Sequence, residues 1–444
     1  MNAKVEVPFY PKSWTLYGSQ LSPFCLKVAA TLSFAGIPFR WHWQREGFFE
    51  FLKYETKVQL IKLGILRVHI PSVSSPLEEF PLVPFLFGED GTAAYDSSHI
   101  ASALWTSHNN CLSENKCLSF AVHLIEEFFD DWGLYVVHHK RWTGKGNNTD
   151  ASKSAGNFVA VKEIGNMSGL PESLLALIGK GFDRRQTLRL GYLFSVAKQG
   201  NETKQRDDLP RSPTGNHPTS KLLDQSFELI LSAVENVLKQ RPFLFGNHPT
   251  VADCALFGQL NMNALIDIGT RMEMEENHPE LIQWLDRIQT FTESFSRQKR
   301  SPRTLTVSRD TTDLASAVYG HTYEFDMDME TLFKPLLPLI RHIFQTYVPL
   351  MQQNEQAYIR YSKEGITTFN ERAFWSNQAM FTGNLLFQKH KFTTVVKTFQ
   401  VQTWRNLKYE YSRLTVKEKH DLSNALAVAN LSRIMFASAN YSSL

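Results

Sequence analysis

The sequence predicts an α/β domain, then an all-α domain, then a helical C-terminal extension. Strand and helix signals alternate through residues 1–112, helical periodicity dominates residues 113–300, and amphipathic segments recur in residues 301–444. A chain of 444 residues also exceeds what one compact core holds, because domains usually contain roughly 100 to 200 residues.

The composition of the chain limits the kinds of molecule that it is expected to bind. Hydrophobic residues make up 43% of the chain and aromatic residues 12%, which is typical of a folded protein. The formal net charge is only +3, so no overall field favours nucleic acid or an anionic membrane. Neither a signal-peptide core nor a long apolar run is present, so we expect no membrane span and a cytoplasmic location. The four cysteines form no C-x-x-C pair and are expected to be thiols.

The first βα unit has clear local signals. Residues 13–17 are strand formers closed by Gly18. Ser22 is an N-cap residue and Pro23 occupies the first helical position, where its missing N–H is not needed. The helix is expected to end at Gly36, and alternating apolar residues from position 37 to 43 predict a second strand.

The remainder of the first domain is expected to contain a hairpin and a capped helix. Residues 44–80 are poorly patterned, with one short helix expected. Residues 82–87 predict a strand containing Pro84, and the turn 88–91 leads to a returning strand at 92–95. A capped helix then begins at Asp96-Ser97.

The predictions for residues 113–300 and 301–444 depend mainly on helical spacing of apolar residues. Residues 199–220 predict a loop and residues 296–311 a linker, because both are rich in charged residues and helix breakers. In the extension, one amphipathic helix is expected from Pro338 with a kink at Pro349. A second places an apolar stripe between Val401 and Leu414.

Three short motifs in the first domain suggest a binding site. Ser22 and Cys25 lie at a helix N-terminus, where free N–H groups and the helix dipole favour a thiolate, although both residues also suit a simple cap and core. Val83-Pro84 indicates an edge strand or a cis proline whose unpaired backbone groups bind a peptide. Asp96 and Ser97 start another helix and suit an ammonium and a carboxylate, or an ordinary cap.

With these motifs in this order, the N-terminal part resembles the glutathione transferases, and Ser22-Pro23-Phe24 is similar to the motif of classes that use serine. Residues 243–255 are similar to the helical-domain signature of that family, in which Thr250 caps a helix and Asp253 returns to the cap. The resemblance implies a thioredoxin-like first domain and a structural role for this second motif.

The resemblance also implies residue roles. Ser22 would hydrogen-bond the glutathione sulfur, Val83-Pro84 would hold the cysteinyl backbone, and Asp96 with Ser97 would hold the γ-glutamyl end. The expected reaction is conjugation of glutathione to a small hydrophobic electrophile in a detoxification role. Members of the family are often dimers, so a homodimer is one expectation, although the extension could cover that interface. Leu82 stands where many relatives have lysine, which departs from the pattern.

Two other functions stay open on the sequence. One is a non-catalytic transferase-like scaffold that binds another protein, and the other is thiol-disulfide exchange through Cys25. No metal is expected, because the run of acidic residues before His138 and His139 fits no standard ligand spacing and helical carboxylates are usually solvated. These acidic residues are Glu126, Glu127, Asp130 and Asp131.

Overall fold

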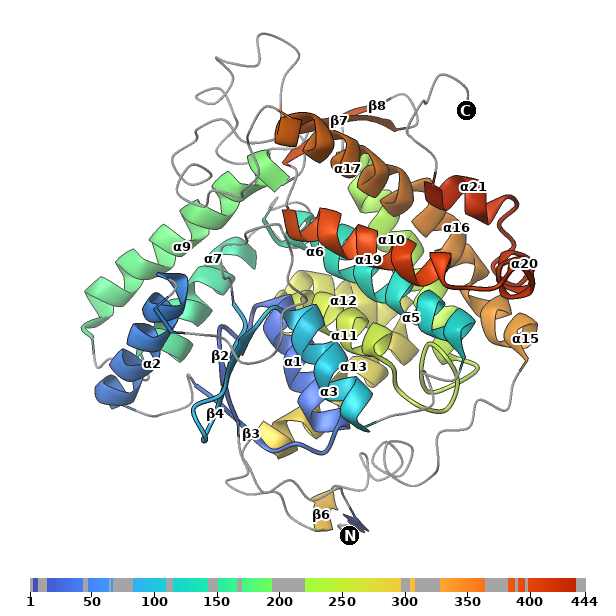
Figure 1. Cartoon of the computed structure of the whole chain (residues 1–444). Coiled ribbons are helices and arrows are strands. Elements are labelled where there is room, and N and C mark those ends of the chain that lie inside the picture. The colour runs from blue at the N-terminus through green and yellow to red at the C-terminus, as the bar shows by residue number, and fades with distance from the viewer. Residues whose placement is uncertain are drawn as a thin grey trace.

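The computed structural model confirms a small mixed sheet followed by many helices (Figure 1). It describes residues 3–6, 14–42, 47–63, 65–66, 83–108, 115–142, 151–165, 170–193, 220–296, 304–307, 328–363, 382–387, 390–395 and 398–436. The predicted loop 199–220, apart from residue 220, lies outside these ranges, as do Trp43, Leu82 and Cys111.

The first domain is built on a four-stranded sheet in the order β3-β2-β4-β5. β2 pairs in parallel with β3 and antiparallel with β4, and β4 and β5 form the expected hairpin. The strands are β2 (Trp14–Tyr17), β3 (Phe39–Trp41), β4 (Phe85–Gly88) and β5 (Ala93–Tyr95). The helices are α1 (Pro23–Phe34), α2 (Gly47–Lys62) and α3 (Ser97–His108).

Alternation along the strands sends side chains to two separate cores. Leu16 and Leu86 pack with α1 and α3 on one face of the sheet, whereas Tyr17, Phe85 and Phe87 pack with α2 on the other. α2 is longer than the short helix expected. Its buried stripe, formed by Tyr54, Val58 and Ile61 at i, i+4 and i+7, is a helical pattern that the sequence analysis missed.

Helices make up most of the described part of the second segment, as expected. Two of them, η1 and η3, are π-helices, in which each turn holds more residues than in an α-helix. The helices are α5 (Lys116–Phe128), η1 (Phe129–Gly133), α6 (Leu134–Trp142), α7 (Ala151–Asn157), η3 (Phe158–Gly165), α9 (Glu172–Leu193), α10 (Ser220–Leu238), α11 (Val251–Ala264), α12 (Ile268–Asn277) and α13 (Pro279–Ser296).

The extension is mostly helical but also contains strands. Its helices are α15 (Met329–Phe333), η4 (Lys334–Leu336), α16 (Leu337–Gln345), α17 (Tyr347–Lys363), α19 (Thr398–Ser412), α20 (Val416–Ala425) and α21 (Leu431–Phe436). β7 (Thr382–Phe387) and β8 (His390–Val395) form a hairpin. β6 (Thr304–Val307) lies within the predicted linker and pairs with β1 (Ala3–Glu6), so that stretch is not linker throughout.

The predicted kink at Pro349 is wrong. The helix is interrupted at Thr346, between α16 and α17, and Pro349 lies in the first turn of α17. A proline is tolerated there because the first N–H groups of a helix have no partner within it. The second amphipathic segment is confirmed as α19, with Val401, Trp404 and Leu407 buried.

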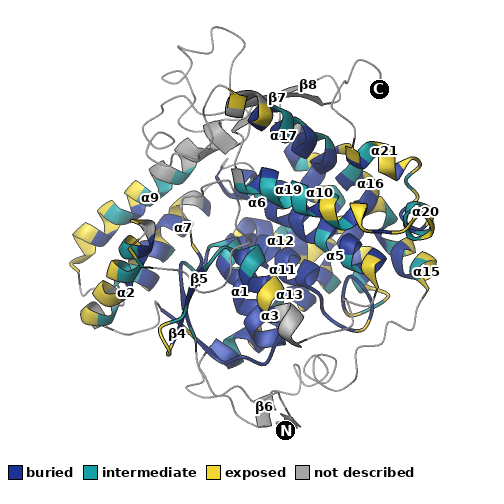
Figure 2. Cartoon of the chain, in the orientation of Figure 1, coloured by how far each residue is buried: buried dark blue, intermediate teal, exposed yellow. Residues whose placement is uncertain are grey.

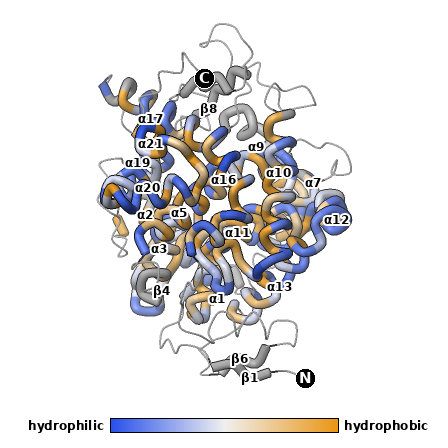
Figure 3. Tube along the Cα trace, turned by 90° about the vertical axis from the view of Figure 1, so that its right-hand side faces the viewer, coloured by the Kyte–Doolittle hydropathy of each residue, from blue (hydrophilic) through white to orange (hydrophobic). Residues whose placement is uncertain are grey.

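One continuous core joins the three predicted segments. Buried residues from Leu16 in β2 to Met435 in α21 belong to a single cluster, visible as the dark interior of Figure 2. α1 packs against α11, and α19 packs against α5 and α17. In Figure 3 the hydrophilic α12 lies at the edge of this bundle. The domain boundaries at 112 and 300 therefore remain predictions.

Candidate functional site

The start of α1 has the predicted cap. Ser22 is the N-cap residue, Pro23 is the first helical residue, and the Ser22 Oγ accepts a hydrogen bond of 3.4 Å from the Cys25 N–H. A hydroxyl can accept two hydrogen bonds and donate one. The cap thus uses an acceptor position of Ser22 and leaves the donor role of its proton to another partner.

The Val83-Pro84 peptide bond is cis, which was one of the two predicted states. β4 begins at Phe85 rather than at residue 82, since proline has no N–H for the ladder. Val83 lies before the strand and is 40% exposed.

Asp96 caps α3, as predicted. Its Oδ1 accepts hydrogen bonds from the N–H groups of Ser98, at 3.0 Å, and of His99, at 3.2 Å. Asp96 has a φ of 75°, a left-handed conformation that is uncommon for a residue other than glycine. Burial alone would raise the pKa of Asp96, but hydrogen bonds and charge from His99 hold this pKa below its ordinary value.

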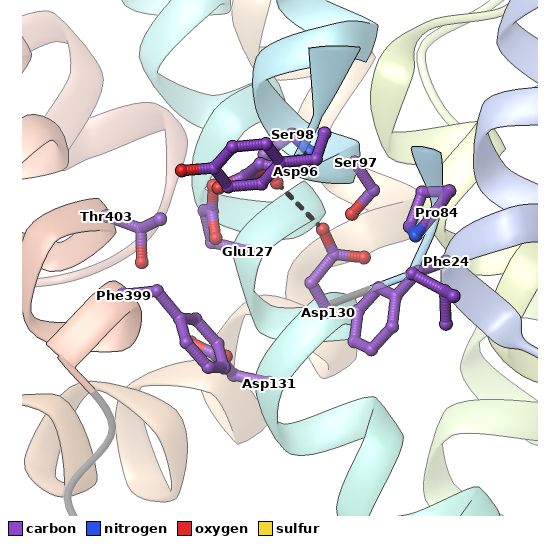
Figure 4. A pocket seen from close by; sticks show the side chains of 12 residues that line it. Phe24, Pro84, Asp96, Ser97, Ser98, Glu127, Asp130, Asp131, Phe399 and Thr403 are labelled. Carbon is purple, nitrogen blue, oxygen red and sulfur yellow. Dashed lines mark hydrogen bonds between the residues drawn. The ribbon is translucent and has the colours of Figure 1, made fainter. Parts of the chain in front are cut away.

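These motifs meet at one pocket (Figure 4). Its open volume, counted out to the solvent at its mouth, is about 630 Å³. The residues that line it are Phe24, Val83, Pro84, Tyr95, Asp96, Ser97, Ser98, Glu127, Asp130, Asp131, Phe399 and Thr403. Four of the five predicted site residues are among them. Ser22 is not, although Phe24, two positions later in the chain, is.

Acidic side chains form a second wall that the sequence analysis did not assign to the site. Glu127 at the end of α5, and Asp130 and Asp131 in η1, were expected to be solvated, but each is at most 9% exposed. Asp130 and Asp131 lie in a five-residue π-helix, in which each turn holds more residues than in an α-helix. The acidic run within an apolar stripe was the available signal.

Lys27 of α1 supplies the buried counter-charge. Its Nζ is 2.6 Å from Glu126 Oε1 and also contacts Asp130 Oδ2, which accepts a hydrogen bond of 3.0 Å from the Ser98 hydroxyl. Burial raises the pKa of Asp130 to about 6 despite the opposing effect of Lys27. Burial and the neighbouring carboxylates also raise the pKa of Glu127 well above its ordinary value.

The C-terminal extension contributes the third wall, through Phe399 and Thr403 of α19. Between them, the Gln400 side-chain amide donates to Asp131 Oδ1 at 2.8 Å and to the Tyr135 hydroxyl at 3.2 Å. α19 is therefore held against η1 and α6 by hydrogen bonds as well as by apolar packing. The sequence analysis had assigned this extension no chemistry.

Cys25 is unsuited to thiol chemistry. It is fully buried, and burial raises the pKa of its thiol to about 12, although the hydrogen bond with Ser22 acts in the opposite direction. Reactive cysteines are exposed and have a lowered pKa. This observation speaks against the alternative of thiol-disulfide exchange through Cys25.

A buried carboxylate also supports the loop before α1. Glu163 of η3 accepts hydrogen bonds from the Gln20 N–H, at 2.6 Å, and from the Ser19 hydroxyl, at 3.1 Å. Burial raises the pKa of Glu163 to about 8. η3 thus helps to fix the turn that leads to Ser22.

The helical-domain motif has the structural role expected of it. Thr250 is the N-cap of α11, and Asp253 accepts hydrogen bonds of 2.8 Å from the N–H groups of both Leu244 and Thr250. α11 then packs directly on α1. A side chain at Gly258 would meet Lys27 N at 3.0 Å, so glycine permits this close approach.

Within the described ranges, no group of three or more His, Cys, Asp or Glu side chains is arranged to hold a metal ion. Of the described helices, none is long and apolar enough to cross a membrane.

Comparison with known proteins identifies two domains. Residues 21–106 match the model of the glutathione S-transferase N-terminal domain, and residues 213–290 match that of the glutathione S-transferase C-terminal domain. The first match contains the predicted site residues, and the second contains the motif around Asp253. No curated protein matches the chain.

Solved structures of similar proteins resemble the chain only weakly. A glutathione S-transferase from Rhodospirillum rubrum is 14% identical, covers 68% of this chain and 99% of its own, and gives a TM-score of 0.31. A glutathione S-transferase from Pseudomonas fluorescens is 17% identical, with coverages of 65% and 98% and a TM-score of 0.27. The beta-etherase of Sphingobium sp. strain SYK-6 is 16% identical, with coverages of 64% and 98% and a TM-score of 0.33.

Proposed function

Because the chain contains the N-terminal and C-terminal domains of the glutathione S-transferase family, we propose that it binds glutathione and conjugates its thiolate to an electrophilic small molecule. The observation that carries this proposal is that Val83, Pro84, Asp96 and Ser97 line one pocket beside the N-terminus of α1. Family membership alone supports glutathione handling in general. The reaction and the residue roles are our inference.

The proposed binding mode follows the chemistry of the tripeptide. No hydrogen bond to the backbone of Val83 is found in the described part of the chain, so its N–H and C=O are suited to pair with the cysteinyl unit as an added strand. The helix start at Ser97 is suited to the γ-glutamyl carboxylate, because N-terminal N–H groups and the helix dipole attract anions.

Ser22 is the proposed catalytic residue. Its Oγ accepts the Cys25 N–H, so its own proton can be donated to the glutathione sulfur, which lowers the pKa of the bound thiol together with the dipole of α1. The sulfur then forms a bond to an electrophilic carbon. The leaving group departs with its bonding electron pair, for example as chloride from a chlorinated aromatic compound.

The test is conjugation of glutathione to 1-chloro-2,4-dinitrobenzene, together with calorimetry of glutathione binding to the full chain. Ser22→Ala should lower kcat at least about ten-fold, since one hydrogen bond to a charged group contributes roughly 1.5–3 kcal/mol. Ser412→Ala, at an exposed position of α19, is the matched control and should change nothing. Unaltered kcat in Ser22→Ala would remove Ser22 from the mechanism.

The calorimetric arm separates the proposed enzyme from the non-catalytic scaffold. Heat of glutathione binding is expected for the enzyme, whereas its absence from a folded protein would favour the scaffold. A cytoplasmic location and a homodimer stay predictions from the sequence.

A further inference from the structure

Acidic side chains line the pocket without a basic side chain beside them in the described lining. Asp96, Glu127, Asp130 and Asp131 are carboxylates, and no lysine, arginine or histidine is found among the described residues of the lining (Figure 4). An anionic or neutral ligand alone would leave these charges uncompensated. The pocket is therefore electrostatically suited to a cation.

Two of the carboxylates lack hydrogen-bond partners where they face the pocket. The Glu127 side chain is buried, with 9% exposure, and makes neither a hydrogen bond nor an ion pair with any described residue. Asp130 is 5% exposed, and its Oδ1 is buried without a hydrogen-bond partner in the described structure. Buried carboxylate oxygens without partners are costly, so a ligand with N–H donors would be favoured there.

The described charges around the pocket do not meet this need. Lys27 is shared between Glu126 and Asp130 and does not line the pocket, and the His99 ring, when protonated, pairs with Asp96 at 3.5 Å. Glutathione brings one ammonium group together with two carboxylates, so its binding would add net negative charge. A further positive charge is needed for balance.

The apolar lining indicates what carries that charge. Phe24, Tyr95 and Phe399 contribute aromatic rings to the same pocket as the carboxylates. An ammonium group is attracted both to carboxylates and to aromatic faces, and an apolar body attached to it would be buried against these rings.

We propose that the second substrate is an electrophile that also carries a protonated amine, whose nitrogen lies between Glu127 and Asp130 and whose apolar body packs against Phe399 and Phe24. This inference names the substrate class of the proposed transferase. It rests on that proposed function, in which glutathione is the co-substrate. It makes α19 of the extension a determinant of substrate specificity.

The experiment compares three probes of nearly equal shape by calorimetry on the full chain at about pH 7.5, with and without glutathione. 2-Phenylethylamine is protonated at this pH, 2-phenylethanol is neutral and phenylacetate is an anion. We expect the amine to bind at least ten-fold more tightly than the alcohol, and phenylacetate to bind most weakly. Equal affinities for the amine and the alcohol would overturn the inference without reference to any variant.

Two isosteric variants test whether Glu127 binds the ammonium group. Glu127→Gln should reduce the preference for the amine at least ten-fold, whereas Glu172→Gln, at an exposed position of α9, should retain it. If the Glu127→Gln variant kept the full preference for the amine over the alcohol, Glu127 would not bind the ammonium group and the proposal would be overturned. A thermal melt of each variant confirms that it is folded.

The glutathione titration distinguishes the two possible failures. If glutathione binds and the amine shows no preference, only this inference is lost. If the amine shows the preference and glutathione gives no heat, the transferase proposal is lost, and the amine site stands as a binding site of another kind.

Discussion

Replacing Gly258 with alanine tests the close contact between α11 and α1. The added Cβ would overlap the carbonyl oxygen of Pro23 and lie 3.0 Å from Lys27 N and 3.2 Å from Lys27 Cβ. Two of these atoms belong to the backbone of α1, so no side-chain rotation relieves the overlap. Overpacking of this kind costs up to about 3 kcal/mol, and the higher helix propensity of alanine returns about 1 kcal/mol. We expect a net loss of about 2 kcal/mol in the free energy of unfolding.

Gly181 in α9 provides the matched control. A Cβ there would meet nothing within 4 Å, so Gly181→Ala should leave stability equal or raise it by up to about 1 kcal/mol. Urea unfolding at equilibrium, followed by circular dichroism, measures both variants. Because Pro23 adjoins Ser22, Gly258→Ala should also weaken glutathione binding. A Gly258→Ala protein as stable as the Gly181→Ala protein would refute the proposed helix contact.

Three further predictions concern buried polar groups. Lys27→Met leaves Glu126 and Asp130 without their cation, so the free energy of unfolding should fall by about 3–5 kcal/mol in urea; an unchanged midpoint would contradict the ion pairs. Gln400→Leu removes the amide that donates to Asp131 of η1 and to Tyr135 of α6, so it should cost about 1–3 kcal/mol and weaken binding of the amine probe; unchanged stability and binding would contradict that attachment. Burial raises the pKa of Glu163 from 4.5 to about 8, so its stabilising contribution is complete below pH 4.5 and is lost as the pH rises through 8. Urea midpoints at about pH 5 and pH 8 should therefore differ by less in Glu163→Gln than in the unsubstituted protein, and equal pH dependence would contradict this assignment.

Local chemistry made parts of the fold readable from the sequence. Ser22 with Pro23, and Thr250 with Asp253, each place a cap within a few residues of the helix that it starts, and both starts are confirmed. The hairpin of β4 and β5 was likewise signalled by its turn. These features depend on residues that are close together in the sequence, so hydrophobic periodicity and turn residues are enough to predict them.

Other features depend on contacts that no local pattern reports. The acidic wall combines Glu127 at the end of α5 with Asp130 and Asp131 of η1, and the third wall requires α19 to pack beside residues far earlier in the chain. Pro349 was misread because proline breaks a helix interior but is accepted in a first turn. The stripe of α2 was missed in a stretch judged poorly patterned.

The wall formed by α19 also bears on how the protein is made. Asp96 and Phe399 are separated by roughly three hundred residues, so at about 5–20 residues per second the ribosome needs roughly 15 to 60 s to synthesise the chain between them. During this interval the nascent chain contains Asp131 but not Gln400, so α19 cannot yet cover η1. The pocket can therefore gain its third wall only after translation has passed Thr403.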